Sequence, residues 1–308
     1  MKLFSGSAHP ELAKRIASYL DINIGQIEIR QFSDGEFWVK FQENIRGADV
    51  FLLQPTHPPA DNLMELLLMI DAARRASAAR ITAVIPYYGY ARQDRKDQPR
   101  VAITARLVAD MLQAASVERV LTMDLHTAQL QGFFNVPVDH LYASYVFLKH
   151  FKKLDNSNLV VVSPDVGGIA LARSYAQKLG VGIAFIDKRR TGPNKSFVMN
   201  VIGEVEDKDI LIIDDIVDTA GTICKTAHRL KRMGCKKIHI ACTHPILSGS
   251  AIKNISKMDI EEFIVSDTIP LHKKAAESGI FTVISTAEVF GEAIRRIHYA
   301  ESLSVLFL

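Results

Sequence analysis

The chain has 308 residues, 48% of them hydrophobic and 23% charged, a composition typical of a globular protein large enough for two domains of ordinary size. The formal net charge of +3 is too small to indicate nucleic-acid binding, and no apolar run reaches the length of a membrane span. The first residues lack the apolar stretch of a signal peptide, and the three cysteines lack a metal-binding or disulfide-framework spacing. We therefore expect a cytoplasmic protein with reduced thiols and with neither nucleic acid nor membrane as a partner.

Strand-length apolar stretches alternate with helix-length stretches along the chain. In the first half, strands are expected at 50–54, 81–85 and 120–123, and helices at 62–75, 103–114 and 141–151. After a polar linker at 152–158 the alternation restarts, with strands at 159–162, 183–186, 210–213 and 238–241 and helices at 168–179 and 220–233. This alternation predicts an α/β protein with parallel sheets flanked by helices. A weak likeness between 120–127 and 210–219 is consistent with two halves of one topology.

Two segments of the first half could contact a nucleotide. Residues 32–36 read Phe-Ser-Asp-Gly-Glu and precede a strand at 37–41; they are either a plain turn or a place where Phe32 stacks on a purine. Residues 90–97 follow the strand at 81–85 and contain Arg92, whose guanidinium can hold a polyphosphate by paired hydrogen bonds. Gln93 or Asp94 could bond a base edge, although tyrosines and charges also cluster at subunit surfaces.

Two further motifs stand at the ends of strands and contain candidate metal ligands. Asp124-Leu125-His126 suits a metal carried by a nucleotide. Because magnesium prefers oxygen, His126 is either an unusual ligand, a partner of phosphate or water, or a structural histidine. In Ser-Pro-Asp-Val-Gly-Gly at 163–168, Asp165 could hold a second metal or sugar hydroxyls, or it could simply cap the following helix.

A strongly cationic segment, Asp-Lys-Arg-Arg-Thr-Gly-Pro-Asn-Lys, occupies 187–195. Coming after a strand and containing Gly and Pro, it predicts a mobile loop that can close over a site. Lys188 and Arg190 on such a loop could neutralise charge that develops on phosphoryl oxygens. The alternative is a solvated surface loop.

The most informative segment is the apolar strand at 210–213 followed by Asp214 and Asp215, then Asp218 and the turn Thr219-Ala220-Gly221-Thr222. The turn opens a helix, and a helix N-terminus with such donors suits phosphate. The paired carboxylates suit vicinal hydroxyls or a bridging metal, so the segment predicts a sugar phosphate site. It resembles the phosphoribosyl-diphosphate-binding motif of the type I phosphoribosyltransferase fold. The alternative is an ordinary helix start beside solvated acids.

Taken together, segments 32–36, 90–95, 124–126, 163–168, 187–190 and 214–222 resemble the class I ribose-phosphate pyrophosphokinase family over nearly the whole chain. The resemblance implies two similar type I phosphoribosyltransferase-like domains. Residues 1–146 would form the ATP and metal side and 147–308 the ribose 5-phosphate side, with the last helix and tail able to pack back on the N-terminal domain. The implied reaction transfers the β,γ-diphosphoryl group of ATP to the anomeric hydroxyl of ribose 5-phosphate, giving 5-phosphoribosyl 1-diphosphate and AMP for nucleotide biosynthesis. Magnesium, as two ions, and a hexamer built from dimers are implied as well.

The resemblance also implies a role for each matching residue. The catalytic cations would be Lys188 and Arg190, and the metal-site residues His126 and Asp165. ATP would be bound, partly across a subunit interface, by Phe32, Asp34, Gly35, Glu36, Arg92, Gln93 and Asp94. Asp214 and Asp215 would bind the ribose hydroxyls, and the 5-phosphate would be bound by Asp218, Thr219, Ala220, Gly221 and Thr222. The chain departs from the family pattern at 96–102, at Asn135 and at 191–192, so it does not predict how phosphate and ADP regulate activity.

Two other functions share part of this pattern. A phosphoribosyltransferase would use the motif at 214–222 but take a base as co-substrate, and the segments at 92–94 and 124–126 count against it. A regulatory paralogue without activity should have lost its cations, whereas Lys188, Arg190 and His126 are all present. A P-loop kinase or a Rossmann dehydrogenase is disfavoured because neither GxxxxGK[ST] nor GxGxxG occurs.

Overall fold

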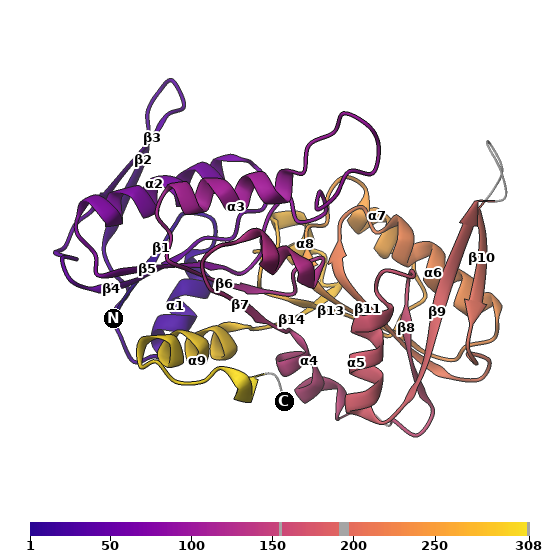
Figure 1. Ribbon diagram of the computed structural model, residues 1–308. Helices are drawn as coiled ribbons and strands as arrows, with labels where there is room; N and C mark the ends of the chain where they lie inside the picture. The colour runs from indigo at the N-terminus through magenta and orange to yellow at the C-terminus, as the bar shows by residue number, and fades with distance from the viewer. Residues whose placement is uncertain (154–155, 191–196, 307–308) are drawn as a thin grey trace. The chain divides into compact units, whose positions relative to one another are not determined.

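The computed structural model describes residues 1–153, 156–190 and 197–306, with the backbone alone at 188–190 and 197–199. The chain forms two compact units. The first consists of Met1–Ala143, Thr268–Pro270 and Ser285–Leu308, and the second of Ser144–Asp267 and Leu271–Ile284. Figure 1 shows that each unit is built around a sheet with helices beside it. In the described part of the chain, no helix is long and apolar enough to cross a membrane.

The sheet of the first unit has five parallel strands in the order β1-β4-β5-β6-β7. Its strands are β1 (Lys2–Ser5), β4 (Asp49–Leu53), β5 (Arg80–Ile85), β6 (Arg119–Met123) and β7 (Val138–Leu141). The connections include α1 (Pro10–Tyr19), α2 (Asp61–Arg75), α3 (Thr104–Ala114) and the 3-10 helix η1 (Ala128–Phe133). Phe51, Leu52 and Leu121 in the middle strands are fully buried, because a parallel sheet is covered on both faces.

The end of the chain, with α9 (Ala287–His298) and the short 3-10 helix η2 (Ser304–Leu306), belongs to the first unit. The Tyr19 hydroxyl at the end of α1 donates to Glu292 of α9 at 3.4 Å, and Arg80 Nη2 donates to the carbonyl of Ile297 at 3.0 Å. A Cβ at Gly291 would lie 2.4 Å from Cδ1 of Tyr19, so only glycine lets the two helices approach this closely. The first unit therefore contains residues from both ends of the sequence, and the two units are not consecutive halves of the chain.

Strands β2 (Ile27–Gln31) and β3 (Phe37–Phe41) form an antiparallel hairpin outside this sheet. Ile29 and Val39 pack against the core of the first unit, whereas the tip at 32–36 is exposed. The tip extends away from the sheet of its unit, at the upper left of Figure 1.

The second unit has a seven-stranded sheet in the order β10-β9-β8-β11-β12-β13-β14, parallel except for β10 at one edge. Its strands are β8 (Leu159–Ser163), β9 (Gly182–Arg190), β10 (Phe197–Ile202), β11 (Asp209–Val217), β12 (Ile238–Pro245), β13 (Glu262–Ser266) and β14 (Phe281–Ile284). Its helices are α4 (Ser144–Phe151), α5 (Ile169–Leu179), α6 (Gly221–Arg232), α7 (Ala251–Ile255) and α8 (Lys273–Glu277).

The strand order of this sheet reverses between β8 and β11. From β8 the chain moves outward through β9 to β10, and it then returns to β11 on the other side of β8. In open α/β sheets, ligands bind outside the carboxyl ends of the strands at such a topological switch point. Asp165 follows β8 and Asp214 lies in β11, so the candidate acids occupy the expected place.

The α/β architecture with parallel sheets is confirmed, but several predicted strand ends are wrong. Strand β11 continues to Val217, so Asp214 and Asp215 lie within the strand rather than after it. Asp214 pairs with Cys242 and Ile216 with His244, because the hydrogen-bond ladder with β12 does not stop at the first polar side chain. In the same way, β9 includes residues 187–190, which the sequence had placed in a loop, and the rest of that predicted loop lies outside the described residues.

Candidate active site

Three carboxylates gather at the switch point of the second unit. The pKa of Asp214 is raised well above its usual value, because burial disfavours its charged form and because Asp215 and Asp165 add negative charge nearby. Asp214 Oδ1 accepts a hydrogen bond of 3.0 Å from the Asp215 backbone N–H. A cluster of acids that repel one another favours a ligand that brings hydroxyl donors or a cation.

Asp165 supports the turn before α5 and also lies near Asp214. Its Oδ1 accepts a hydrogen bond of 3.1 Å from the N–H of Gly168, so it holds the turn before α5, although Gly168 and not Asp165 is the N-cap residue of this helix. The Ser163 hydroxyl also donates to the Asp165 carbonyl at 2.6 Å. Asp165 nevertheless lies close enough to Asp214 to raise the pKa of that residue, so the same side chain faces the acid cluster.

The turn that follows β11 is built to present backbone donors. Ala220 adopts a left-handed conformation with φ of 61°, and α6 begins at the next residue. At the start of this helix, the N–H of Cys224 donates to the carbonyl of Ala220 at 2.9 Å. The N–H groups of Gly221, Thr222 and Ile223 come before it, and such groups have no acceptor within their own helix. The first turn of α6 contains no acidic residue, so the helix start suits an anion.

Two residues that sequence reasoning missed hold this turn. The Ser248 hydroxyl donates to Asp218, and Asn254 Nδ2 donates to the carbonyl of Thr219 at 3.2 Å. They lie some thirty residues further along the chain, in the loop after β12 and in α7. A single serine and a single asparagine in a loop carry no spacing signal, so only the fold could identify them.

In the first unit, the structure joins two of the predicted segments. The Thr127 hydroxyl, next to His126, donates to Asp94 Oδ2 at 3.0 Å. Gln93 is engaged at the start of α3, where its carbonyl accepts from the N–H of Ala105 at 3.1 Å and its side-chain oxygen accepts from the Thr104 hydroxyl. Arg92 and His126 are exposed beside these contacts.

Asp124 is buried where β6 ends and has a positive φ of 35°. Its Oδ2 accepts a hydrogen bond of 3.3 Å from the N–H of Ala143, and the N–H of the following Leu125 donates to His140 Nε2 at 2.9 Å. These contacts hold Asp124 inside the unit, whereas His126 lies at the surface.

The predicted purine-binding tip is an exposed turn. Phe32 is 52% exposed, a large fraction for a phenylalanine. The Phe32 N–H donates to the Glu36 carbonyl at 2.8 Å, the Glu36 N–H donates to Asp34 Oδ1 at 3.1 Å, and Gly35 has a φ of 98°. These hydrogen bonds lie within the hairpin and do not join the tip to the loop at 92–94.

The two predicted catalytic cations lie partly outside the described residues. The backbone of Lys188 pairs with Met199 and that of Arg190 with Phe197, in the β9–β10 ladder. Their side chains, and all of the segment 191–196, lie outside the described part of the chain.

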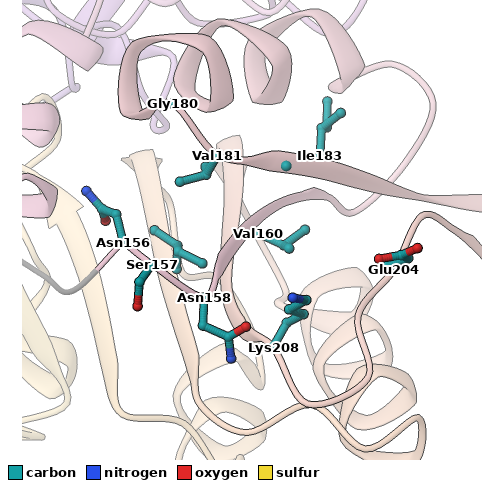
Figure 2. Close-up of a pocket in the computed structure, with 11 residues that line it drawn as sticks. Asn156, Ser157, Asn158, Val160, Gly180, Val181, Ile183, Glu204 and Lys208 are labelled. Atoms are coloured by element: carbon teal, nitrogen blue, oxygen red, sulfur yellow. The ribbon is translucent and has the colours of Figure 1, made fainter.

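A cavity of about 410 Å³ lies elsewhere in the second unit. The residues that line it include Val160, Val181, Ile183, Glu204 and Lys208 (Figure 2). These residues lie at or near the amino ends of β8, β9 and β11, the opposite edge from the acid cluster. This cavity is therefore separate from the candidate site.

Two family models match the chain. The N-terminal domain of ribose phosphate pyrophosphokinase matches residues 1–116, and the phosphoribosyl transferase domain matches residues 143–272. The ribose-phosphate pyrophosphokinase of Chlorobaculum tepidum is 53% identical over 308 residues, covering 100% of this chain and 95% of that protein. That of Bordetella pertussis is 52% identical over 307 residues and covers 99% of each chain. The crystal structure of phosphoribosylpyrophosphate synthetase from Mycobacterium smegmatis is 41% identical, with a TM-score of 0.92 and coverage of 97% of this chain and 99% of that one.

The two α/β units, together with these matches, thus define a protein of phosphoribosyltransferase-type domains. More particularly, the chain belongs to the ribose-phosphate pyrophosphokinase family. The predicted enzyme class, an ATP-dependent diphosphotransferase, is confirmed by these relatives.

Proposed function

We propose that this enzyme transfers the β,γ-diphosphoryl group of ATP to ribose 5-phosphate and releases AMP. The anomeric hydroxyl of the pentose attacks the β-phosphorus in line, while the bond from that phosphorus to the oxygen bridging it to the α-phosphate breaks. The hydroxyl proton leaves, and the products are 5-phosphoribosyl 1-diphosphate and AMP. Positioning and charge stabilisation contribute most to catalysis of such a transfer.

The observation that carries this proposal is the arrangement at the carboxyl ends of β8 and β11. An acid cluster of Asp165, Asp214 and Asp215 stands beside a helix start whose N–H groups can hold an anion. We assign the ribose hydroxyls to Asp214 and Asp215, and the 5-phosphate to the turn at 218–222. A sugar phosphate presents both kinds of group at matching ends, and its hydroxyls would offset the repulsion among the carboxylates.

We assign the ATP and metal side to the first unit. The hydrogen bond between Thr127 and Asp94 holds the loop of Arg92 against the segment that carries His126. Arg92 would bind the polyphosphate of ATP, and Gln93 and Asp94 would take part in the same ATP site. The exposed tip of Phe32, Asp34, Gly35 and Glu36 would reach the purine of an ATP bound to a neighbouring subunit, which is why we propose an oligomer, a hexamer built from dimers.

Magnesium fits the donor set of this chain. Among the described residues, no group of three or more His, Cys, Asp or Glu could hold a metal ion by itself. Magnesium that enters with a nucleotide needs only one or two protein oxygens, because phosphates and water supply the rest. Asp165 offers such an oxygen within the acid cluster, and His126 could bond a metal-bound water or a phosphate. Two bound ions would neutralise charge on the transferring diphosphoryl group.

The remaining roles complete the proposal. Lys188 and Arg190 would stabilise the charge that develops on the phosphoryl oxygens in the transition state. Residues 1–146 would serve ATP and metal and residues 147–308 ribose 5-phosphate, in a cytoplasmic enzyme of nucleotide biosynthesis. Identity to ribose-phosphate pyrophosphokinases along almost the whole chain favours this reaction over a base-using phosphoribosyltransferase.

The test is an assay of AMP release from ATP and ribose 5-phosphate, without any nucleobase, at varied magnesium, phosphate and ADP. We expect AMP and 5-phosphoribosyl 1-diphosphate in equal amounts, and only when magnesium is present. Release of ADP in place of AMP, or a product that requires a base, would refute the proposed reaction. No turnover by a folded chain that binds both substrates would identify a regulatory paralogue.

A further inference from the structure

The turn at 218–222 is held by the segment 247–254, which follows β12 and includes the first part of α7. Leu247 anchors this segment: its N–H donates to the carbonyl of Val217 at 3.0 Å, and its carbonyl is 3.2 Å from His272 Nε2. His272 in turn accepts, through Nδ1, the N–H of Ala275 at 3.3 Å. A histidine that accepts at Nδ1 can donate at Nε2, so Leu247 is tied at both backbone groups.

Asn254 controls the direction of one peptide plane in the turn. Its Nδ2 donates to the Thr219 carbonyl at 3.2 Å and also lies 3.1 Å from the Ser250 hydroxyl. The carbonyl of Thr219 and the N–H of Ala220 belong to one planar trans peptide and therefore point in opposite directions. By holding the carbonyl on its own side, Asn254 points the N–H of Ala220 away from α7. This constraint also supports the left-handed φ of 61° at Ala220, which is unfavourable for a residue with a Cβ.

Ser248 fixes the position of a carboxylate at the same turn. Its hydroxyl donates to Oδ1 of Asp218, the residue that opens the turn. A carboxylate free to swing toward the N–H groups would compete with a phosphate for them and would repel it. The hydrogen bond draws the Asp218 carboxylate toward the loop after β12.

We propose that Asn254 and Ser248 are positioning residues for the 5-phosphate of ribose 5-phosphate: they hold the turn at 218–222 in its anion-binding form without touching the reacting atoms. This inference rests on the proposed function, because it names the groups that shape the pentose phosphate site. It predicts a loss of affinity for ribose 5-phosphate that leaves the affinity for ATP unchanged.

The experiment compares Asn254→Ala, Asn254→Asp, Ser248→Ala and Ser248→Thr with the unaltered enzyme. The affinities for ribose 5-phosphate and for ATP are measured separately by isothermal titration calorimetry, together with KM and kcat. Loss of one hydrogen bond should weaken ribose 5-phosphate binding about 3- to 10-fold in both alanine variants. Asn254→Asp keeps the shape but cannot donate, so it should bind ribose 5-phosphate at least as weakly as Asn254→Ala. Ser248→Thr restores the hydroxyl and should restore the affinity.

Ser256→Ala is the matched control, because the Ser256 hydroxyl bonds to the carbonyl of Lys253 in its own segment and leaves the turn untouched. It should change neither affinity. Equal losses for ATP and ribose 5-phosphate, or unaltered ribose 5-phosphate binding in the Asn254 variants, would overturn this inference. Failure of the unaltered enzyme to bind ribose 5-phosphate would instead refute the proposed function.

Discussion

Thr127 and Asp94 are joined by a hydrogen bond of 3.0 Å that links the loops following β5 and β6 in the first unit. Thr127→Val removes the donor while keeping the shape of the side chain. We expect the KM for ATP to rise about 5-fold, the worth of one such bond, while binding of ribose 5-phosphate stays unchanged. Steady-state kinetics with each substrate varied in turn checks this. Thr127→Ser, which keeps the hydroxyl, is the control, and an equal rise in that variant would argue against a role for the bond.

Glu65 is a buried carboxylate that holds the loop after β1. It is 1% exposed, its Oε2 accepts from the Ser7 hydroxyl at 2.6 Å, and its Oε1 accepts from Gln54 Nε2 at 2.9 Å. Glu65→Ala leaves these donors without a partner, so the free energy of unfolding should fall by about 3 kcal/mol. Urea unfolding measures this, and Glu65→Gln, which keeps an acceptor, should lose less. A fall below about 1 kcal/mol for Glu65→Ala would show that water replaces the carboxylate.

Gly6 lies against the same network. A Cβ at this position would be 2.3 Å from Gln54 Oε1 and 2.5 Å from Glu65 Oε1, so Gly6→Ala must displace both side chains. We expect a loss of about 1–3 kcal/mol in the same urea measurement. Gly132→Ala is the matched control, because a Cβ there would meet nothing within 4 Å. Equal stability of the two variants would contradict the crowding at Gly6.

His57 should make stability depend on pH. Burial, and then the charge of His9, lower the pKa of His57 from 6.5 to about 4. The unfolded chain therefore binds a proton that the folded chain does not, and folding loses stability as the pH falls from about 6.5 to about 4. Allowing for the part of the ring that solvent still reaches, the loss is about 2 kcal/mol. Thermal unfolding between pH 7.5 and 4.5 should show a smaller slope for His57→Gln, whereas the exposed His228→Gln should follow the unaltered chain. A slope unchanged in His57→Gln would contradict this assignment.

Lys188 should matter for turnover rather than for binding. A cation that acts on charge developing in the transition state lowers the barrier without stabilising the bound substrate. Lys188→Ala should therefore reduce kcat about 100-fold or more, with the dissociation constant of ribose 5-phosphate unchanged. Rapid-quench measurement of AMP formation tests the first statement and calorimetry the second, with Lys257→Ala as a surface control. Near-normal turnover in Lys188→Ala would remove this residue from the catalytic set.

Much of the fold could be predicted because its signals are local. Apolar stretches such as 159–162 and 210–213 identify parallel strands, and a Thr-Ala-Gly-Thr turn after paired acids predicts a phosphate site, which stays a prediction. Strand ends were missed because the ladder continues past polar residues: Asp214 pairs with Cys242 however polar its side chain is. Ser248 and Asn254 could not be found, because they reach the turn only after β12 has brought their loop back beside it. The roles of Lys188 and Arg190 stay predictions.

A crystal structure of the enzyme with ribose 5-phosphate tests the central claim most directly. We expect the 5-phosphate about 3 Å from the backbone N–H groups of Gly221 and Thr222, with the ribose hydroxyls hydrogen-bonded to Asp214 and Asp215. A pentose bound with its phosphate elsewhere, and the turn at 218–222 left without it, would contradict the account.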